Sequence, residues 1–202
     1  MSSFYCEHCG ALIADTPACG YITGCEHYPM EGKKMTKHTS TGIDKAALDR
    51  LGKNWMVRTD NDGLSHDGFR WAPIGEWTEC PRWNENTKAD CTSGGLFGQG
   101  PGGLGYAQPG SRFVFCETKG KRISVKGDKI KVAAAKILYI GIDAFDALNH
   151  VCQHSWSGSL DLSGCDLKGV TLPQSVSGWL DLRGCDLKGV TLPNHLKDKV
   201  FK

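Results

Sequence analysis

The sequence predicts an α+β protein with a small zinc-ribbon-like N-terminus, a mixed α+β middle domain and a short C-terminal β-solenoid of 20-residue repeats. Three observations support this prediction: four cysteines cluster within the first 25 residues, short apolar segments alternate with glycine-containing turns in the middle, and one segment near the C-terminus is repeated. The expected parts are residues 1–30 (zinc-ribbon-like module), 31–54 (basic linker and short helix), 55–142 (α+β domain) and 143–202 (helix, two-repeat solenoid and C-terminal cap).

The composition of the 202 residues is that of a folded protein. Hydrophobic residues make up 40% and charged residues 23%, which excludes a disordered chain, and the net charge of +2 creates no strong global field. No apolar run reaches the roughly 18–20 residues of a membrane span, and residues 11–14 are too few for the core of a signal peptide. We therefore expect a cytoplasmic protein that does not bind membranes.

The N-terminal cysteines have the spacing of a metal site. Cys6 and Cys9 are separated by two residues and followed by a glycine, a tight turn that directs two thiolates at one ion. Cys19, Cys25 and His27 can supply the other two ligands, and the sequence leaves open whether Cys19 or His27 is the fourth. About 30 residues bury too little apolar surface to fold alone, which favours a structural Zn2+.

Local signals predict the elements of residues 41–142. Thr41 and Asp44 have the spacing of a capping box, so a helix is expected to start there and to end near Gly52. Strands are expected where apolar and polar residues alternate, with turns at the glycines between them. The expected segments are a strand at 55–58, a hairpin turn at 60–63, strands at 112–117 and 121–125 separated by Gly120, and a strand, a turn and a second strand within 129–142.

The clearest feature of the sequence is a repeat with a period of 20. The segment Leu160–Pro173 recurs as Leu180–Pro193, and 13 of the 14 positions match, the difference being Ser163 against Arg183. Such a period indicates coils that stack on one another and bury their leucines. The side chains expected to point inward are those of Leu160, Leu162, Leu167, Val170 and Leu172, with their partners 20 residues later.

Two repeats are too few to be stable alone, so the stack is expected to need caps. Residues 143–151 are predicted to form a short helix at one end, and residues 195–202 to cap the other. Cys165 and Cys185 are expected to stack about 4.8 Å apart as packing groups. An uncapped coil would leave apolar edges, so a homodimer through the end of the solenoid is a further expectation.

The outer side of the coils is the expected partner-binding surface. Charged and aromatic side chains recur there in rows that another protein can contact. The residues are Asp161, Lys168, Trp179, Asp181, Arg183 and Lys188.

Three sets of residues carry a resemblance to phage proteins. The repeat, with its Leu-Asp-Leu-x-Gly-Cys-Asp-Leu pattern, resembles the leucine-rich or pentapeptide-like solenoid repeats of phage and bacterial accessory proteins. The middle region resembles an uncharacterised phage and bacterial domain at residues 63–71, at Cys91 with residues 94–97, and at residues 127–132. Phe97 stands where that domain usually has a histidine. The cysteine-rich start is similar to small phage proteins.

The resemblance implies a phage or prophage accessory protein in the cytoplasm of a bacterial host. Such a protein would bind and modulate a host protein, for example a defence component, rather than act as an enzyme, and no catalytic residue is assigned.

Two alternative functions stay open from the sequence. One is a group-transfer enzyme, ADP-ribosyltransferase-like, with a pocket in the middle domain near His66, Arg70, Trp71 and Phe97. The other is zinc-dependent nucleic-acid binding through a basic strip. The residues of this basic strip are Lys119, Lys121, Arg122, Lys126, Lys129 and Lys131.

Overall fold

The chain forms two compact units, Met1–Thr39 and Ser40–Lys202. The computed structural model describes residues 4–5, 12–14, 42–65, 68–87, 94–100, 111–125 and 129–201. In the first unit, strands β1 (Phe4–Tyr5) and β2 (Leu12–Ala14) pair antiparallel.

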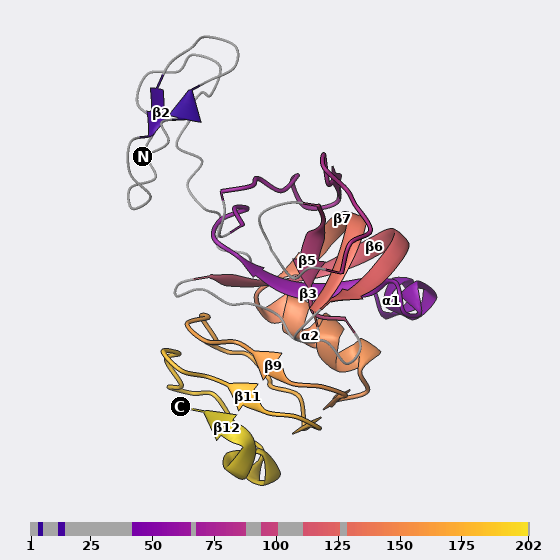
Figure 1. Ribbon diagram of the computed structural model, residues 1–202. Coiled ribbons are helices and arrows are strands. Elements are labelled where there is room, and N and C mark those ends of the chain that lie inside the picture. Colours follow the sequence, from indigo (N-terminus) through magenta and orange to yellow (C-terminus); the bar gives the residue numbers. More distant parts are fainter. Residues whose placement is uncertain are drawn as a thin grey trace. The chain divides into compact units, whose positions relative to one another are not determined.

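The second unit is a mixture of helices and mostly antiparallel strands, which confirms the predicted α+β class (Figure 1). Helix α2 lies between a central sheet and the C-terminal segments in this view. The elements are α1 (Lys45–Leu51), β3 (Trp55–Asp60), β4 (Trp77–Glu79), β5 (Leu96–Gly98), β6 (Arg112–Val125), β7 (Lys129–Ile140), α2 (Ile142–Val151), β8 (Ser155–Trp156), β9 (Leu160–Asp161), β10 (Ser175–Val176), β11 (Leu180–Asp181), the 3-10 helix η1 (Asn194–Lys199) and β12 (Val200–Phe201).

A five-stranded antiparallel sheet forms the centre of this unit. Its order is β3-β6-β7-β4, and β5 also pairs with β7. Successive side chains of a strand point to opposite faces, so Phe113 and Phe115 of β6 enter one hydrophobic cluster and Val114 and Cys116 enter another. The sheet is therefore buried on both faces.

The two strands predicted around Gly120 are one strand in the structure. β6 runs through Gly120, which has φ 80°, and its register on β7 shifts between Lys119 and Arg122. A glycine at positive φ inside a bulge bends a strand without ending its ladder. The strand residues were predicted correctly, whereas the turn between them was wrong.

Residues 129–140 likewise form the single strand β7, and not a strand, a turn and a second strand. β7 is paired on one side by β6 and on the other by β4 and β5. Because both of its edges are occupied, the strand stays extended to Ile140. The chain turns at Gly141, which has φ 62°, and continues as α2.

Helix α1 confirms the predicted helix but begins later than its expected capping box. The carboxylate of Asp44 accepts a hydrogen bond from the N–H of Ala47 at 2.9 Å, which makes Asp44 the N-cap. The helix ends at Leu51, before Gly52 with φ 56°. The N–H of Asp44 also donates to the hydroxyl of Tyr139 at 3.0 Å, which ties the start of α1 to β7.

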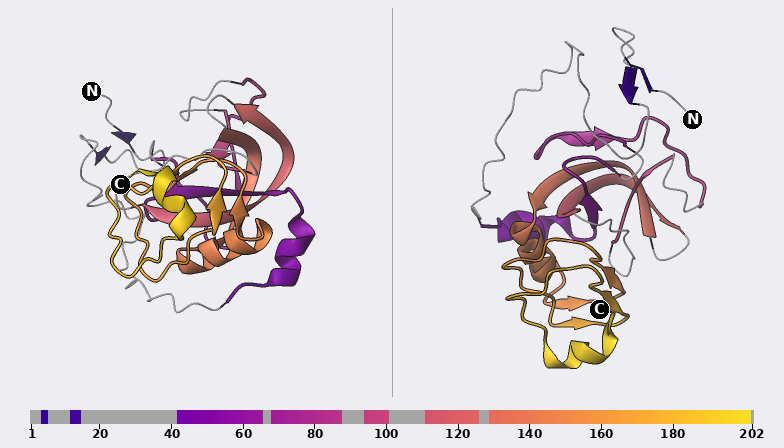
Figure 2. Two further views of the ribbon diagram at one scale, coloured as in Figure 1. Left: turned by 90° about the horizontal axis from the view of Figure 1, so that it is seen from below. Right: turned by 90° about the vertical axis from the view of Figure 1, so that its left-hand side faces the viewer.

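The C-terminal segments lie on one another in parallel register with an offset of 20 residues. Leu160 pairs with Leu180, and Leu180 pairs with Val200; β8 and β10 pair with the same offset. We call residues 155–174 coil 1, residues 175–194 coil 2 and residues 195–201 the half coil. Both views in Figure 2 show these segments layered one on the next, with η1 at the far end.

The sheet and the coils share one hydrophobic core through α2. Phe145 of α2 stacks on Phe113 of the sheet at a centroid distance of 4.1 Å, while Asn149 donates from Nδ2 to the carbonyl of Thr171 in coil 1 at 2.9 Å. α2 thus covers the start of the stack, as expected of the helix at 143–151. Among the described helices, none is long and apolar enough to cross a membrane.

Candidate interaction surface

The outer side of the β9-β11-β12 ladder gathers most of the side chains predicted to meet a partner. Leu160, Leu162, Leu180 and Leu182 point into the core with 0–1% exposure, so the residues that alternate with them face outward. We call this outer side the ladder face. Its residues are Asp161, Ser163, Trp179, Asp181, Arg183 and Phe201.

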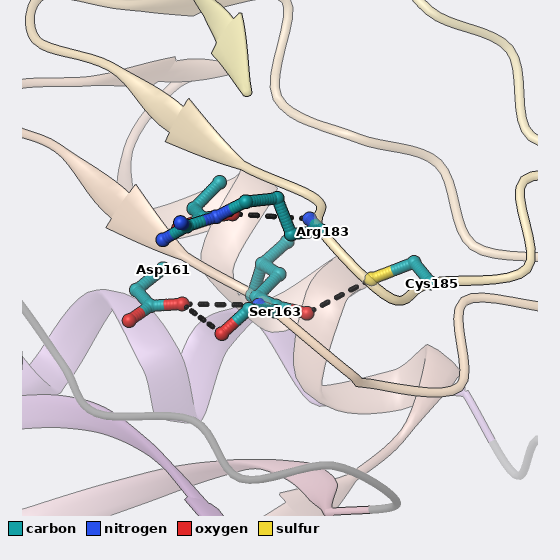
Figure 3. A network of polar contacts seen from close by, with 6 residues as sticks. Asp161, Ser163, Arg183 and Cys185 are labelled. Carbon is teal, nitrogen blue, oxygen red and sulfur yellow. Dashed lines mark hydrogen bonds and ion pairs between the residues drawn. The ribbon is translucent and has the colours of Figure 1, made fainter. Parts of the chain in front are cut away.

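Two carboxylates of the ladder face lie in register on neighbouring strands. Asp161 pairs with Asp181, and like charges directly opposite each other destabilise a ladder. The guanidinium of Arg183 offsets this repulsion: its Nε lies 3.0 Å from both carboxylate oxygens of Asp181. In coil 1 the same place belongs to Ser163, whose N–H and hydroxyl donate to Asp161 at 3.0 and 2.8 Å (Figure 3).

This pair of interactions makes Asp181 a buried anion. Its side chain is 2% exposed, whereas that of Arg183 is 67% exposed. The hydrogen bonds from Arg183 lower the pKa of Asp181 and raise the pKa of Arg183. Asp181 was expected in an exposed row, but it is covered, and Arg183 presents the charge at this point of the surface.

An aromatic pair adjoins these charges. The rings of Trp179 and Phe201 meet edge to face at a centroid distance of 5.7 Å. Trp179 is half-buried, while Phe201 is 53% exposed and is one of the few large apolar side chains that the described residues expose. The ladder face therefore combines an exposed aromatic ring with an exposed guanidinium.

Lys168 and Lys188 lie on a different side of the coils, in the turns that follow the ladder. Both are exposed, as expected. Each turn is held by an aspartate two residues earlier: Asp166 accepts from the N–H of Lys168 at 3.0 Å, and Asp186 accepts from the N–H of Lys188 at 2.9 Å. The lysine side chains are thus free of the turn-forming hydrogen bonds.

The two repeat thiols have the chemistry of packing groups. The thiol of Cys185 donates to the carbonyl of Leu162 at 3.0 Å. Burial raises the pKa of Cys165 to about 12 and also raises the pKa of Cys185, so both thiols keep their protons at neutral pH.

The residues expected around a pocket in the middle domain have separate roles. Trp71 belongs to the core with 4% exposure, the guanidinium of Arg58 lies 4.1 Å from the centre of its ring, and its Nε1 donates to Ser65 Oγ at 3.0 Å. Arg70 is exposed, Phe97 is half-buried on β5, and His66 lies outside the described residues.

The basic strip on β6 and β7 is largely engaged within the protein. Lys119 pairs with Glu79 at 3.3 Å and Lys121 pairs with Glu85. The guanidinium of Arg122 donates to the carbonyl of Trp55 at 2.8 Å. Lys126 lies outside the described residues, and Lys129 is half-buried. Phosphate binding by this strip would have to compete with these interactions.

The last residue of the strip, Lys131, is completely buried. Its Nζ donates to the carbonyl of Asn86 at 2.6 Å and to the side-chain oxygens of Asn84 and Asn86, both at 3.1 Å. A Cβ on Gly95 would lie 2.0 Å from Cγ of Lys131, so the glycine makes room for the lysine stem. Lys131 fastens the loop at residues 84–86 to the sheet.

Phe201 is the surface residue that the sequence did not predict. It belongs to the half coil, whose similarity to the repeat is confined to a few apolar positions. Trp156, Val176 and Leu196 are all buried and are spaced by 20, as are Leu180 and Val200. This spacing is visible in the sequence, but η1 replaces the rest of the coil and hides the pattern.

The predicted zinc ligands Cys6, Cys9, Cys19, Cys25 and His27 all lie outside the described residues. Within the described part of the chain, no three His, Cys, Asp or Glu residues group as a metal site. Comparison with protein families, curated proteins and solved structures found no match to this chain.

Proposed function

We propose that this chain is a phage-type accessory protein that binds and modulates a protein of its bacterial host, and that it binds through the ladder face of a short β-solenoid formed by residues 155–201. The observation that carries the proposal is the exposed pair of Phe201 and Arg183 beside Trp179. Aromatic residues and arginine dominate the binding energy of protein interfaces.

The support beneath these side chains favours binding over a purely structural role. The ladder face stands on leucines that are almost completely buried, and backbone hydrogen bonds from Leu160 and Leu182 hold the three strands together at 2.9 Å. Side chains on such a base lose little conformational entropy when a partner docks. A rigid surface with one exposed ring and one exposed cation is suited to a protein partner with a small apolar pocket edged by acidic groups.

The test begins with capture of host proteins on the immobilised full chain, followed by purification of each candidate and titration calorimetry. Phe201→Ala and Arg183→Ala should each weaken the complex by at least about tenfold, because each removes a contact of the hot-spot type. Ile74→Ala is the matched control, since Ile74 is 45% exposed and belongs to the central part of the unit. A partner whose affinity falls with Ile74→Ala and not with the two ladder-face variants would contradict the proposal.

We also propose that the first 30 residues bind one zinc ion through Cys6, Cys9 and Cys25, with Cys19 or His27 as the fourth ligand. The spacing of these residues supports the proposal. Metal analysis of the purified chain should find about one zinc per chain. Replacing Cys6 and Cys9 by serine should remove it, and unchanged zinc content would contradict the assignment.

A further inference from the structure

The last turn of coil 2 is less covered than the same turn of coil 1. Leu167, Val170 and Leu172 are 0%, 5% and 2% exposed because coil 2 lies on them. Their counterparts 20 residues later, Leu187, Val190 and Leu192, are only partly buried. The sequence of the two turns is the same, so the difference comes from the missing layer.

The half coil covers only part of the end of the stack. Val200 and Phe201 lie on Leu180 and Asp181, and Leu196 is buried with 1% exposure. No described residue repeats the turn at 186–192 for a third time. The end of the stack therefore has a raised part, residues 195–201, and a recessed part, residues 186–192, which we call the open turn.

We propose that the open turn is covered by the open turn of a second copy of this chain, in a dimer with two-fold symmetry. Inside one molecule, a turn with this sequence is already covered by another turn with the same sequence. The occupant whose chemistry is known to fit this surface is therefore a copy of the turn itself. Leu187, Val190 and Leu192 would then reach the burial of their counterparts in coil 1.

The charges at the open turn complement each other under a two-fold axis. Asp186 and Lys188 flank Leu187, both are exposed, and neither has an ion-pair partner among the described residues. A two-fold axis beside Leu187 reverses the order of its neighbours, so Asp186 of one copy faces Lys188 of the other, twice. The same surface thus attracts a copy in one orientation and register.

Sedimentation equilibrium of the full chain under reducing conditions tests the dimer. The mass should approach twice 22.0 kDa as the concentration rises. Asp186→Lys and Lys188→Asp each place like charges opposite each other, and each should raise the dissociation constant at least about tenfold. The double variant Asp186→Lys with Lys188→Asp restores opposite charges and should restore the dimer.

The matched control is Asp166→Lys in coil 1. It removes the same turn hydrogen bond, to the N–H of Lys168 at 3.0 Å, but lies away from the open turn, so the dimer should persist. Lys188→Asp keeps the bond made by Asp186 and remains informative if Asp186→Lys folds poorly. A chain that stays monomeric, or a dimer that neither single variant weakens, would overturn the proposal. Binding of a host protein is an independent question, because it is measured with ladder-face variants.

Discussion

Arg183 occupies the one position of the 14-residue match at which the two repeats differ, and its guanidinium clamps the buried carboxylate of Asp181, with Nη2 2.5 Å from Oδ2. The equivalent Ser163 offers Asp161 two hydrogen bonds without a charge. The stacked carboxylates of Asp161 and Asp181 thus share a single cation, and the repeat is asymmetric at the place where symmetry would be most costly.

The first prediction concerns acid stability. Arg183→Ser gives Asp181 the environment of Asp161, so hydrogen bonds remain while the cation is lost. Because Arg183 lowers the pKa of Asp181, its stabilising effect is present above the ordinary aspartate pKa and disappears as the pH falls through the lowered value. The urea midpoint of the variant should be lower than that of the native chain at pH 7 and nearly equal to it at pH 2–3. An equal gap at both pH values would contradict this account.

The second prediction concerns alkaline stability. Burial raises the pKa of Cys116 from 9.0 to about 12, so the native state holds a proton that the unfolded state loses. The contribution of this thiol is complete below pH 9 and is lost as the pH rises through about 12. Stability should fall by about 1 kcal/mol per pH unit in this range from this group.

Urea titrations at pH 8 and pH 10.5 measure this effect. Cys116→Ala should be less stable than the native chain at pH 8 but should lose less stability between the two pH values. Cys152, whose pKa burial also raises to about 12, provides a second variant with the same expected behaviour. Native and variant chains with the same pH dependence would show that the buried thiols do not govern it.

The third prediction concerns Lys131, which anchors the loop at residues 84–86. Lys131→Met keeps the length of the side chain but leaves the oxygens of Asn84 and Asn86 without their donor. The variant should lose about 2–3 kcal/mol of unfolding free energy. Lys119→Met on the neighbouring strand, where the lysine is 48% exposed, should lose less than about 1 kcal/mol. Equal losses in the two variants, by urea denaturation, would refute the anchoring role.

The fourth prediction compares two leucines at the same position of the repeat. Leu172 is 2% exposed, and Leu172→Ala should cost about 2–5 kcal/mol. Leu192 is only partly buried, so Leu192→Ala should cost less than half as much in dilute, monomeric protein. If the dimer forms, the cost at Leu192 should grow with protein concentration, which thermal denaturation at several concentrations would show.

The sequence predicts those elements whose signal is local. The Asp-Gly turn is an example: Asn61 and Leu64 bridge across Asp62 and Gly63, which have φ of 53° and 83°, as the hairpin signal requires. The inward leucines of coil 1 follow equally well from the 20-residue period.

What the sequence does not predict depends on distant partners. Gly120 carries the local signal of a turn, yet β7 pairs with both sides of it and keeps the strand continuous. The burial of Lys131 depends on a loop 45 residues earlier, and the place of Phe201 depends on a register set by Leu180. The shared core of sheet, α2 and coils also arises from such contacts, since the sequence divides these segments at residue 142.

Each ladder pair between the coils joins residues 20 apart, and this gives the C-terminal part a unit of growth. A copy of residues 155–174 inserted after Gln174 would place every new side chain beside a neighbour of the kind it has now. An insertion with one residue more or fewer would turn leucines outward and aspartates inward. The length of this stack can therefore change only in whole coils, while α2 and the half coil close its two ends unchanged.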